Sequence, residues 1–289
     1  MRSHINENGV AAVTFGADVP WIDERPGRIL AEVLGSGSVL MYRGGMGTTF
    51  VAGIVRPDPK DTRLAAWQPD PTIVDLPITT DDWPYLYLRK AAIPPAYWQM
   101  LVVIGVVCLA LIARSFPQAM RPNWHFWLLG AGFLLIEFKS VTELALLFGT
   151  TWLVNALAIS GVLLMAVVAN LLVLHLRRVN LRRVYALLLG SLILSYFFPL
   201  ELLIGLPPSI RGITSMVLLS FPIFSAGVIF SESLRRAGET AGPLASNLSG
   251  SFAGGVLEYG SLLWGIKSLY LIAAVVYAGA LIAQQMERD

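Results

Sequence analysis

Long apolar runs fill the chain from Tyr97 onward, and they restrict its fold more than any other feature. A run of about 18 or more apolar residues is long enough to cross the hydrocarbon core of a bilayer as an α-helix. An unpaired backbone cannot face lipid, so consecutive runs of this kind predict a helical bundle. Seven candidate spans follow one another, at approximately Tyr97–Ala113, Trp124–Phe148, Thr151–His175, Val184–Leu206, Gly212–Ser231, Ala245–Trp264 and Ser268–Gln284.

The composition agrees with a chain that lies mostly in lipid. Hydrophobic residues make up 55% of the sequence and charged residues only 14%, with a mean hydropathy of +0.65. Soluble domains carry about a quarter charged residues, so the balance is far from theirs. The separators between the runs contain Pro, Gly and Arg, which end helices or resist burial. We therefore predict an α-helical membrane bundle of about seven transmembrane helices over residues 97–289, with the lipid bilayer as its partner.

The sixth span is unusually rich in small residues, as ASNLSGSFAGGVLEYGS shows. Small side chains let two helix backbones approach closely in a membrane. This stretch predicts a tightly packed helix in the interior of the bundle.

The N-terminal part has a different character. Apart from Asp289, every aspartate lies within residues 1–82. GVAAVTFGA predicts a strand, PWIDERPGRILAEVLG a helix, and SVLMYR and TTFVAGIV two further strands. A proline-rich connector follows. Residues 1–93 therefore predict a small, partial α/β domain that is near the size at which a core becomes marginal.

Several strings in the chain resemble a known family. In order, they are VTFGADVPWIDERPGRILAEVLG, GTTFVAG, TTDDWPYLYLRKAAIP, GAGFLLIEFKSVTELALLFGTTWLVNA and SNLSGSFAGGVLEYGSLLWGIKSLYLIA. Together they resemble bacterial polytopic membrane proteins that carry a spermidine-synthase-like domain, over nearly the whole chain. The resemblance implies a Rossmann-like aminopropyltransferase or methyltransferase-type domain ahead of the membrane helices. It also implies a bacterial inner-membrane location.

The chain departs from that family at the cofactor site. A Rossmann-like domain needs a Gly-rich turn between its first strand and the helix that follows. GSGS at Gly35–Ser38 follows a helix and precedes a strand, and GGMG at Gly44–Gly47 is typical of a hairpin turn. We therefore expect no cofactor in this chain, which resembles the C-terminal part of such a protein. A Rossmann-like catalytic domain would be supplied upstream or in trans.

Asp81 and Asp82 are the only catalytic candidates in the N-terminal part, and both are weak. The resemblance places TDDWP at the end of the synthase-like domain, where a carboxylate could face a cationic substrate. The simpler interpretation is a turn, because Thr and Asp side chains readily bond nearby backbone amides before a proline.

Three charges stand within the second span. Lys139 and Glu143 are four residues apart, which places them about 40° apart on one helix face and within pairing distance. Glu137 lies on a nearly opposite side. A charge at the centre of a membrane helix costs at least about 2.5 kcal/mol, so such residues usually face the bundle interior. Further polar residues in other spans are Asn155, Asn170, Glu201, Asn247 and Glu258.

Two interpretations of these polar residues stay open. Glu137 and Glu258, with Lys139, Glu143 and Asn155 as polar company, are candidates for handling a proton or a cation along a transport path. The alternative is that the same groups only hydrogen-bond the helices together.

Other chemistry is not supported. The three histidines are far apart in the sequence and lack Cys or Asp neighbours, so no metal site is expected. Basic residues gather at the ends of spans and do not form a nucleic-acid patch, so no nucleic-acid partner is expected. The chain would either be the membrane-embedded part of a spermidine-synthase-like protein, not catalytic alone, or a transporter-like bundle for a small, cationic solute. Whether it is an enzyme is therefore uncertain.

Charge also predicts an orientation. With seven spans, nine arginines share a face with the C-terminus: Arg114, Arg121, Arg177, Arg178, Arg182, Arg183, Arg235, Arg236 and Arg288. Four basic residues lie on the other face: Arg89, Lys90, Arg211 and Lys267. The positive-inside rule predicts a cytoplasmic C-terminus and an external N-terminal part. This conflicts with a nucleoside-cofactor enzyme, which belongs in the cytoplasm.

Overall fold

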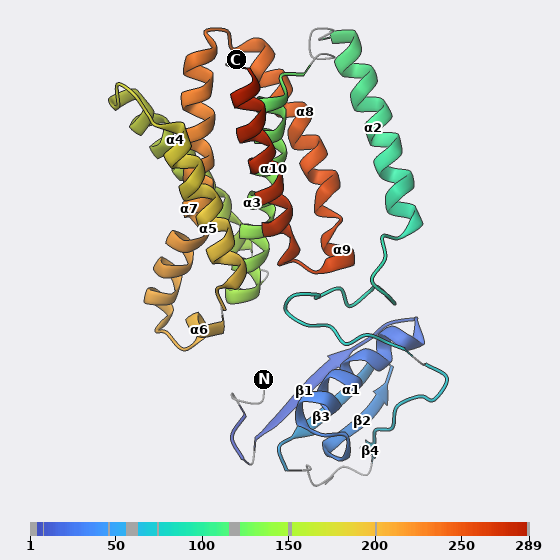
Figure 1. Ribbon diagram of the computed structural model, residues 1–289. Coiled ribbons are helices and arrows are strands. Elements are labelled where there is room, and N and C mark those ends of the chain that lie inside the picture. Colours follow the sequence, from blue (N-terminus) through green and yellow to red (C-terminus); the bar gives the residue numbers. More distant parts are fainter. Residues whose placement is uncertain are drawn as a thin grey trace. The chain divides into compact units, whose positions relative to one another are not determined.

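A computed structural model describes residues 5–7, 9–45, 47–55, 63–73, 75–115, 122–149, 152–199 and 201–287. The chain divides into two compact units, residues 1–92 and residues 93–289. Figure 1 shows a small sheet unit and a helical unit.

The N-terminal unit is a four-stranded antiparallel sheet with one long helix. Its strands follow the order β1-β3-β2-β4, and every neighbouring pair is antiparallel. The elements are β1 (Val10–Phe15), α1 (Pro20–Leu34), a short 3₁₀ turn η2 (Ser36–Ser38), β2 (Val39–Gly44), β3 (Gly47–Gly53) and β4 (Ala65–Ala66).

A small apolar core joins α1 to this sheet. Leu30 of α1 packs with Phe50 of β3 and with Trp67, and all three are buried. Gly27 lies directly against these rings, because a Cβ there would be 2.7 Å from both Phe50 and Trp67. The absence of a side chain at Gly27 therefore allows the helix to sit close to the sheet.

The sequence predicted the first three strands and the helix of this unit correctly. It missed β4, whose two alanines pair with Leu40 and Met41 of β2. The sheet also differs from what a Rossmann-like domain requires, because the described strands contain no parallel pair. β1 and β2 each pair with β3 and therefore run in the same direction, and α1 connects them across β3, which lies between them in the sheet.

The second unit is almost entirely helical. Its helices are α2 (Pro95–Ser115), α3 (Trp124–Phe148), α4 (Trp152–His175), α5 (Leu181–Phe197), α6 (Glu201–Ile204), α7 (Pro208–Ala237), α8 (Ala241–Glu258), α9 (Ser261–Trp264) and α10 (Ser268–Met286). Two of the predicted spans are each divided between a long helix and a short one. The fourth is divided between α5 and α6, and the sixth between α8 and α9. The fourth span ends as α5 before Pro199, because the residue before a proline disfavours helical backbone.

Three of the described helices are long and apolar enough to cross a membrane, where the sequence predicted seven. They are the segments Ala158–His175, Ile210–Ala237 and Ser268–Met286. The other long helices fall short for identifiable reasons. Helix α3 carries Glu137, Lys139 and Glu143, α5 has 17 residues, and α8 is diluted by glycine and serine. In α2 the apolar segment within the described residues is Pro95–Leu111, which has fewer than 18 residues.

Helices α3 and α8 pack face to face through small residues. A Cβ at Gly250 or Gly254 of α8 would overlap the backbone of Trp127 or Ala131 in α3. Close backbone approach was predicted for this stretch and is confirmed. An interior position was also predicted for this helix, and it is not confirmed, because Leu248 on another face of α8 is 74% exposed.

Candidate functional site

The charges of α3 divide as the helical spacing predicted. The Nζ of Lys139 donates to the Oε1 of Glu143 at 2.5 Å, and both side chains are buried. The hydroxyl of Tyr270 in α10 donates to the other oxygen of Glu143 at 2.5 Å. Lys139 also lies over the Tyr270 ring, 4.8 Å from its centre. This group, the Lys139–Glu143–Tyr270 cluster, joins α3 to α10.

The other predicted polar residues do not join that cluster. Glu137 is half-buried on α3 and makes no hydrogen bond with any described residue. Asn155 is exposed on α4, and Glu258 is half-buried where α8 ends. The structure therefore assembles only two of the five intramembrane candidates.

Asp81 and Asp82 lie in a turn of the N-terminal unit. The Thr80 hydroxyl accepts from the Trp83 amide at 3.0 Å, and the Thr80 amide donates to the Trp83 carbonyl at 3.2 Å. Asp81 is exposed and Asp82 is half-buried. Hydrogen bonds of Thr80 thus close the turn on which both carboxylates are carried.

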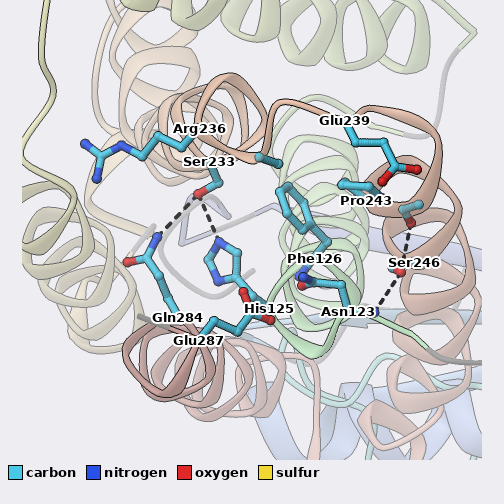
Figure 2. Close-up of a pocket in the computed structure, with 12 residues that line it drawn as sticks. Asn123, His125, Phe126, Ser233, Arg236, Glu239, Pro243, Ser246, Gln284 and Glu287 are labelled. Atoms are coloured by element: carbon cyan, nitrogen blue, oxygen red, sulfur yellow. Dashed lines mark hydrogen bonds between the residues drawn. The ribbon is translucent and has the colours of Figure 1, made fainter. Parts of the chain in front are cut away.

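A cavity of about 440 Å³ opens at one end of the helical unit and is the candidate site (Figure 2). It is formed where α3 and α8 begin and where α7 and α10 end. Its lining is polar for a membrane protein and includes Asn123, His125, Ser233, Glu239, Ser246, Gln284 and Glu287. We call it the end cavity.

A chain of hydrogen bonds crosses the inner wall of the end cavity. His125 Nδ1 lies 3.0 Å from the carbonyl oxygen of Ala280, and Nε2 lies 2.9 Å from Ser233 Oγ. A carbonyl can only accept, so Nδ1 carries the proton and the Ser233 hydroxyl donates to Nε2. The amide of Gln284 donates to Ser233 Oγ at 3.4 Å. All three side chains are buried, so the chain gives this wall one defined arrangement of donors and acceptors.

The opposite wall is held by serine and asparagine. Ser246 Oγ accepts from the Asn123 amide at 3.0 Å and donates to the Gly242 carbonyl at 2.9 Å. The Asn123 side chain caps α3 by accepting from the Phe126 amide. These bonds tie the start of α3 to the start of α8, as Figure 2 shows.

Two carboxylates stand at the mouth of the end cavity. Glu239 follows α7 and Glu287 follows α10, and both are exposed. One guanidinium, that of Arg236, also lines the cavity. Its charge is already engaged, because its Nε donates to Glu232 at 2.6 Å and its Nη2 to the Val179 carbonyl at 2.8 Å. In Figure 2 the Arg236 guanidinium points away from the hydrogen-bonded side chains of His125 and Gln284.

Sequence reasoning missed this site. It considered His125 only as a metal ligand, and none of Ser233, Gln284, Glu239 or Glu287 was singled out. The available signal was polar residues recurring at the ends of three spans that share one side of the bundle. His125 is 108 positions from Ser233 and 155 positions from Ala280, so sequence spacing alone could not show that these residues meet.

A second, smaller cavity lies deeper in the bundle. Its volume is about 260 Å³, and its polar lining residues are Asn170, Ser231 and Asn247. Phe126 lines the end cavity and Phe230 lines the deeper one, and their rings meet edge to face with centroids 6.0 Å apart. The linings of the two cavities therefore meet at this aromatic pair. Neither Glu137 nor Glu258 lines either of them.

The described residues contain no group of three His, Cys, Asp or Glu side chains suited to a metal ion. No known family model, curated protein or solved structure matches the chain.

Proposed function

We propose that this chain is a multi-pass membrane protein whose seven long helices all cross the bilayer. Contacts support an alternation of direction along the chain. The start of α3 at His125 meets the ends of α7 and α10, so α3 opposes both. Gly250 of α8 lies against Trp127 of α3, so these two run parallel. Tyr97 at the start of α2 stacks on Tyr259 after α8, so α2 opposes α8.

The remaining helices follow the same alternation. Arg235 near the end of α7 donates to carbonyls at the end of α4, so α4 and α7 are parallel. Helix α5 follows α4 after a short turn and opposes α10, because Tyr185 lies near Tyr277 and Ser195 near Tyr270. A chain that crosses a membrane repeatedly must reverse at each crossing, and all seven long helices satisfy this. The pairing of Lys139 with Glu143 and the tight α3–α8 contact explain how α3 and α8 can cross despite their lower hydropathy.

We further propose that the end containing the end cavity faces the cytoplasm. The alternation places Arg114, the α4–α5 arginines and Arg235 and Arg236 at one end, together with the end of α10. Positive residues favour the cytoplasmic side. A reporter fused to the C-terminus should be active only in the cytoplasm, and periplasmic activity there would reverse the assignment.

We propose that the bundle is the membrane-embedded part of a spermidine-synthase-like protein, and that its end cavity binds a small solute carrying amines. The observation that carries this proposal is the polar end cavity with carboxylates at its mouth. Glu239 and Glu287 can pair with ammonium groups at the entrance, where water keeps the cost of the charges low. The hydroxyl and amide oxygens inside can accept hydrogen bonds from N–H groups.

Size and polarity favour such a solute. Small-molecule sites are typically cavities of about 300–1,000 Å³ with a few well-placed polar groups, and the end cavity at about 440 Å³ is within that range. The side chains of Gln284, Ser233 and His125 are already hydrogen-bonded to one another. Their fixed arrangement can select a solute without disturbing a buried charge.

Direct binding tests this proposal. The full chain, purified in detergent, would be titrated with putrescine and spermidine by calorimetry, and the double variant Glu239→Gln, Glu287→Gln would be compared with wild type. Glu7, an exposed carboxylate in the N-terminal unit, supplies the matched control Glu7→Gln. We expect saturable binding that weakens at least about tenfold in the double variant and is unchanged in the control. No saturable binding by wild type, or equal binding by all variants, would reject the end cavity as an amine site.

The deeper cavity favours a second candidate function, a transporter-like bundle. Two cavities whose linings meet at the Phe126–Phe230 pair could form successive stations on a path for the same solute. Reconstituted into liposomes, the wild-type chain would then move labelled putrescine. Phe230→Ala would raise the rate by removing the barrier, and Asn170→Leu would lower it. Binding without any uptake would leave the end cavity as a binding site and exclude transport.

A further inference from the structure

The α4–α5 hairpin carries an uncompensated cluster of arginines. Four of them, all exposed, stand within seven residues: Arg177, Arg178, Arg182 and Arg183. None of these four forms an ion pair or a hydrogen bond through its side chain with any residue in the part of the chain that the structure describes. The cluster is therefore not neutralised within the helical unit.

Part of the cluster surrounds a cavity. A hollow of about 410 Å³ is lined by Arg178, Val179, Asn180, Leu181, Arg182 and Arg236. Three arginine residues thus line one open hollow. We call it the arginine cavity. It is distinct from the end cavity in its lining, with only Arg236 in common.

The wall of the arginine cavity that belongs to α7 is rigidly held. Buried Glu232 binds both Arg235 and Arg236. Arg236 also donates to the Val179 carbonyl at 2.8 Å, while Arg235 donates to the carbonyls of Val173 and Leu176 at 2.7 and 2.9 Å. These bonds fasten the end of α7 to the α4–α5 turn. They keep Arg236 in place before any ligand arrives.

The arginine cavity has more positive than negative charge around it. Glu232 supplies one negative charge, and it is shared by two arginines. The hairpin arginines add four further positive charges and no acid. Guanidinium groups bind phosphate oxygens through paired N–H donors, with a planar geometry that a lysine cannot copy. A phosphate group would fit the charge, the donors and the volume.

The surroundings point to the membrane interface. Leu174, on α4, and Leu176, directly after α4 ends, are 74% and 42% exposed, beside the arginine cluster. Apolar side chains next to arginines at the end of a spanning helix match the depth of lipid phosphates. We propose that the arginine cavity binds a phosphate group, carried either by an anionic phospholipid or by a free phosphate ion. It is a site separate from the amine site proposed for the end cavity.

Lipid binding to the purified full chain tests the proposal. Native mass spectrometry would count bound dioctanoyl phosphatidylglycerol in a detergent that preserves the protein. Inorganic phosphate would be titrated in a parallel arm by calorimetry. The double variant Arg178→Gln, Arg182→Gln removes two of the three lining cations, and both residues are exposed, so folding should survive. Arg114→Gln at the same end of the bundle removes an exposed arginine outside the cavity and serves as the matched control.

We expect a lipid affinity reduced about tenfold or more in the double Gln variant and unchanged in Arg114→Gln. The double change to lysine, Arg178→Lys with Arg182→Lys, keeps the charge and loses the paired donors, so an intermediate affinity is expected. Binding of phosphatidylglycerol without binding of inorganic phosphate would assign the site to a lipid headgroup. Binding of inorganic phosphate at least as tight would assign it to free phosphate. Equal losses in the double Gln variant and in Arg114→Gln would show diffuse surface attraction and overturn the proposal, as would no binding in either arm.

Discussion

Each unit of this protein buries a cationic side chain. The N-terminal unit pairs it with backbone carbonyls, and the helical unit pairs it with a carboxylate. In the N-terminal unit the Arg25 side chain of α1 is fully buried and has no carboxylate partner among the described residues. Its guanidinium donates to the carbonyls of Tyr85, Leu86 and Leu88 at 3.0, 2.6 and 2.8 Å. In the helical unit, Lys139 is matched by the carboxylate of Glu143.

The difference follows from what the backbone can offer. The segment around Tyr85 is irregular, so its carbonyls are not all used by backbone amides and can accept from Arg25, although that of Tyr85 also accepts from the Leu88 amide. In a long helix the carbonyls are already engaged by amides four residues on, so a buried cation there depends on side chains. Burial lowers the pKa of Arg25, because the charged form has lost water. The carbonyl oxygens offset this loss. So do the rings of Trp21 and Trp83, whose centres lie 5.2 and 5.8 Å from the Arg25 Cζ.

The strongest test of the comparison breaks the pair in α3. Lys139→Met leaves Glu143 charged in a low-dielectric interior, and we expect a loss of about 3–5 kcal/mol in stability. The double change Lys139→Met, Glu143→Met removes both charges and should restore most of it. Thermal unfolding in detergent measures both variants. Equal losses in the single and double variants would reject the pairing.

The next test removes the cation of the N-terminal unit. Arg25→Met leaves three carbonyls without their charged donor, and we expect about 3 kcal/mol of local destabilisation. Here no second substitution can rescue the loss, because the partners are backbone atoms. Hydrogen exchange of the full chain should show faster exchange over residues 85–88. Unchanged protection in that segment would mean that the Arg25 hydrogen bonds do not hold it.

A partly exposed carboxylate in the same unit, that of Asp70, should matter less. Hydrogen bonds from the hydroxyl and amide of Thr72 lower the pKa of Asp70 below its usual value. A lowered folded pKa contributes stability that is complete above the unfolded pKa and is lost as the pH falls through the folded pKa. Wild type should therefore lose a small increment below about pH 4 that Asp70→Asn lacks. Superimposable acid-unfolding curves for the two proteins would contradict this.

Glu137 gives the smallest expected effect on stability. It is half-buried without a hydrogen-bond partner among the described residues, so Glu137→Gln should change stability by no more than about 0.5 kcal/mol. Thermal unfolding in detergent checks this beside the Lys139 variants. A loss of solute transport with stability intact would make Glu137 a functional carboxylate, whereas collapse of the variant would make it structural.

The sequence predicted local features of the fold well. The helix of the second span was placed at the same residues, Trp124–Phe148, as α3. The pairing of Lys139 with Glu143 followed from helical spacing, because residues four apart share a face in any α-helix. The N-terminal helix and three strands followed from apolar patterning. The predicted count of seven spans was not confirmed, because three of the described helices are long and apolar enough to cross a membrane, and α3, α5 and α8 are not.

What only the tertiary structure decided is which distant residues meet. Tyr270 completes the Lys139–Glu143 pair from 127 positions away, and His125 meets Ser233 from 108 positions away. No periodicity in a single sequence encodes such contacts, since they depend on how helices rotate and slide against one another. The sequence by itself determined where the chain is apolar, where its helices run and where its arginines gather, because these follow from local chemistry. The cavities arise only when separate helix ends come together, so they could be described only in the folded chain.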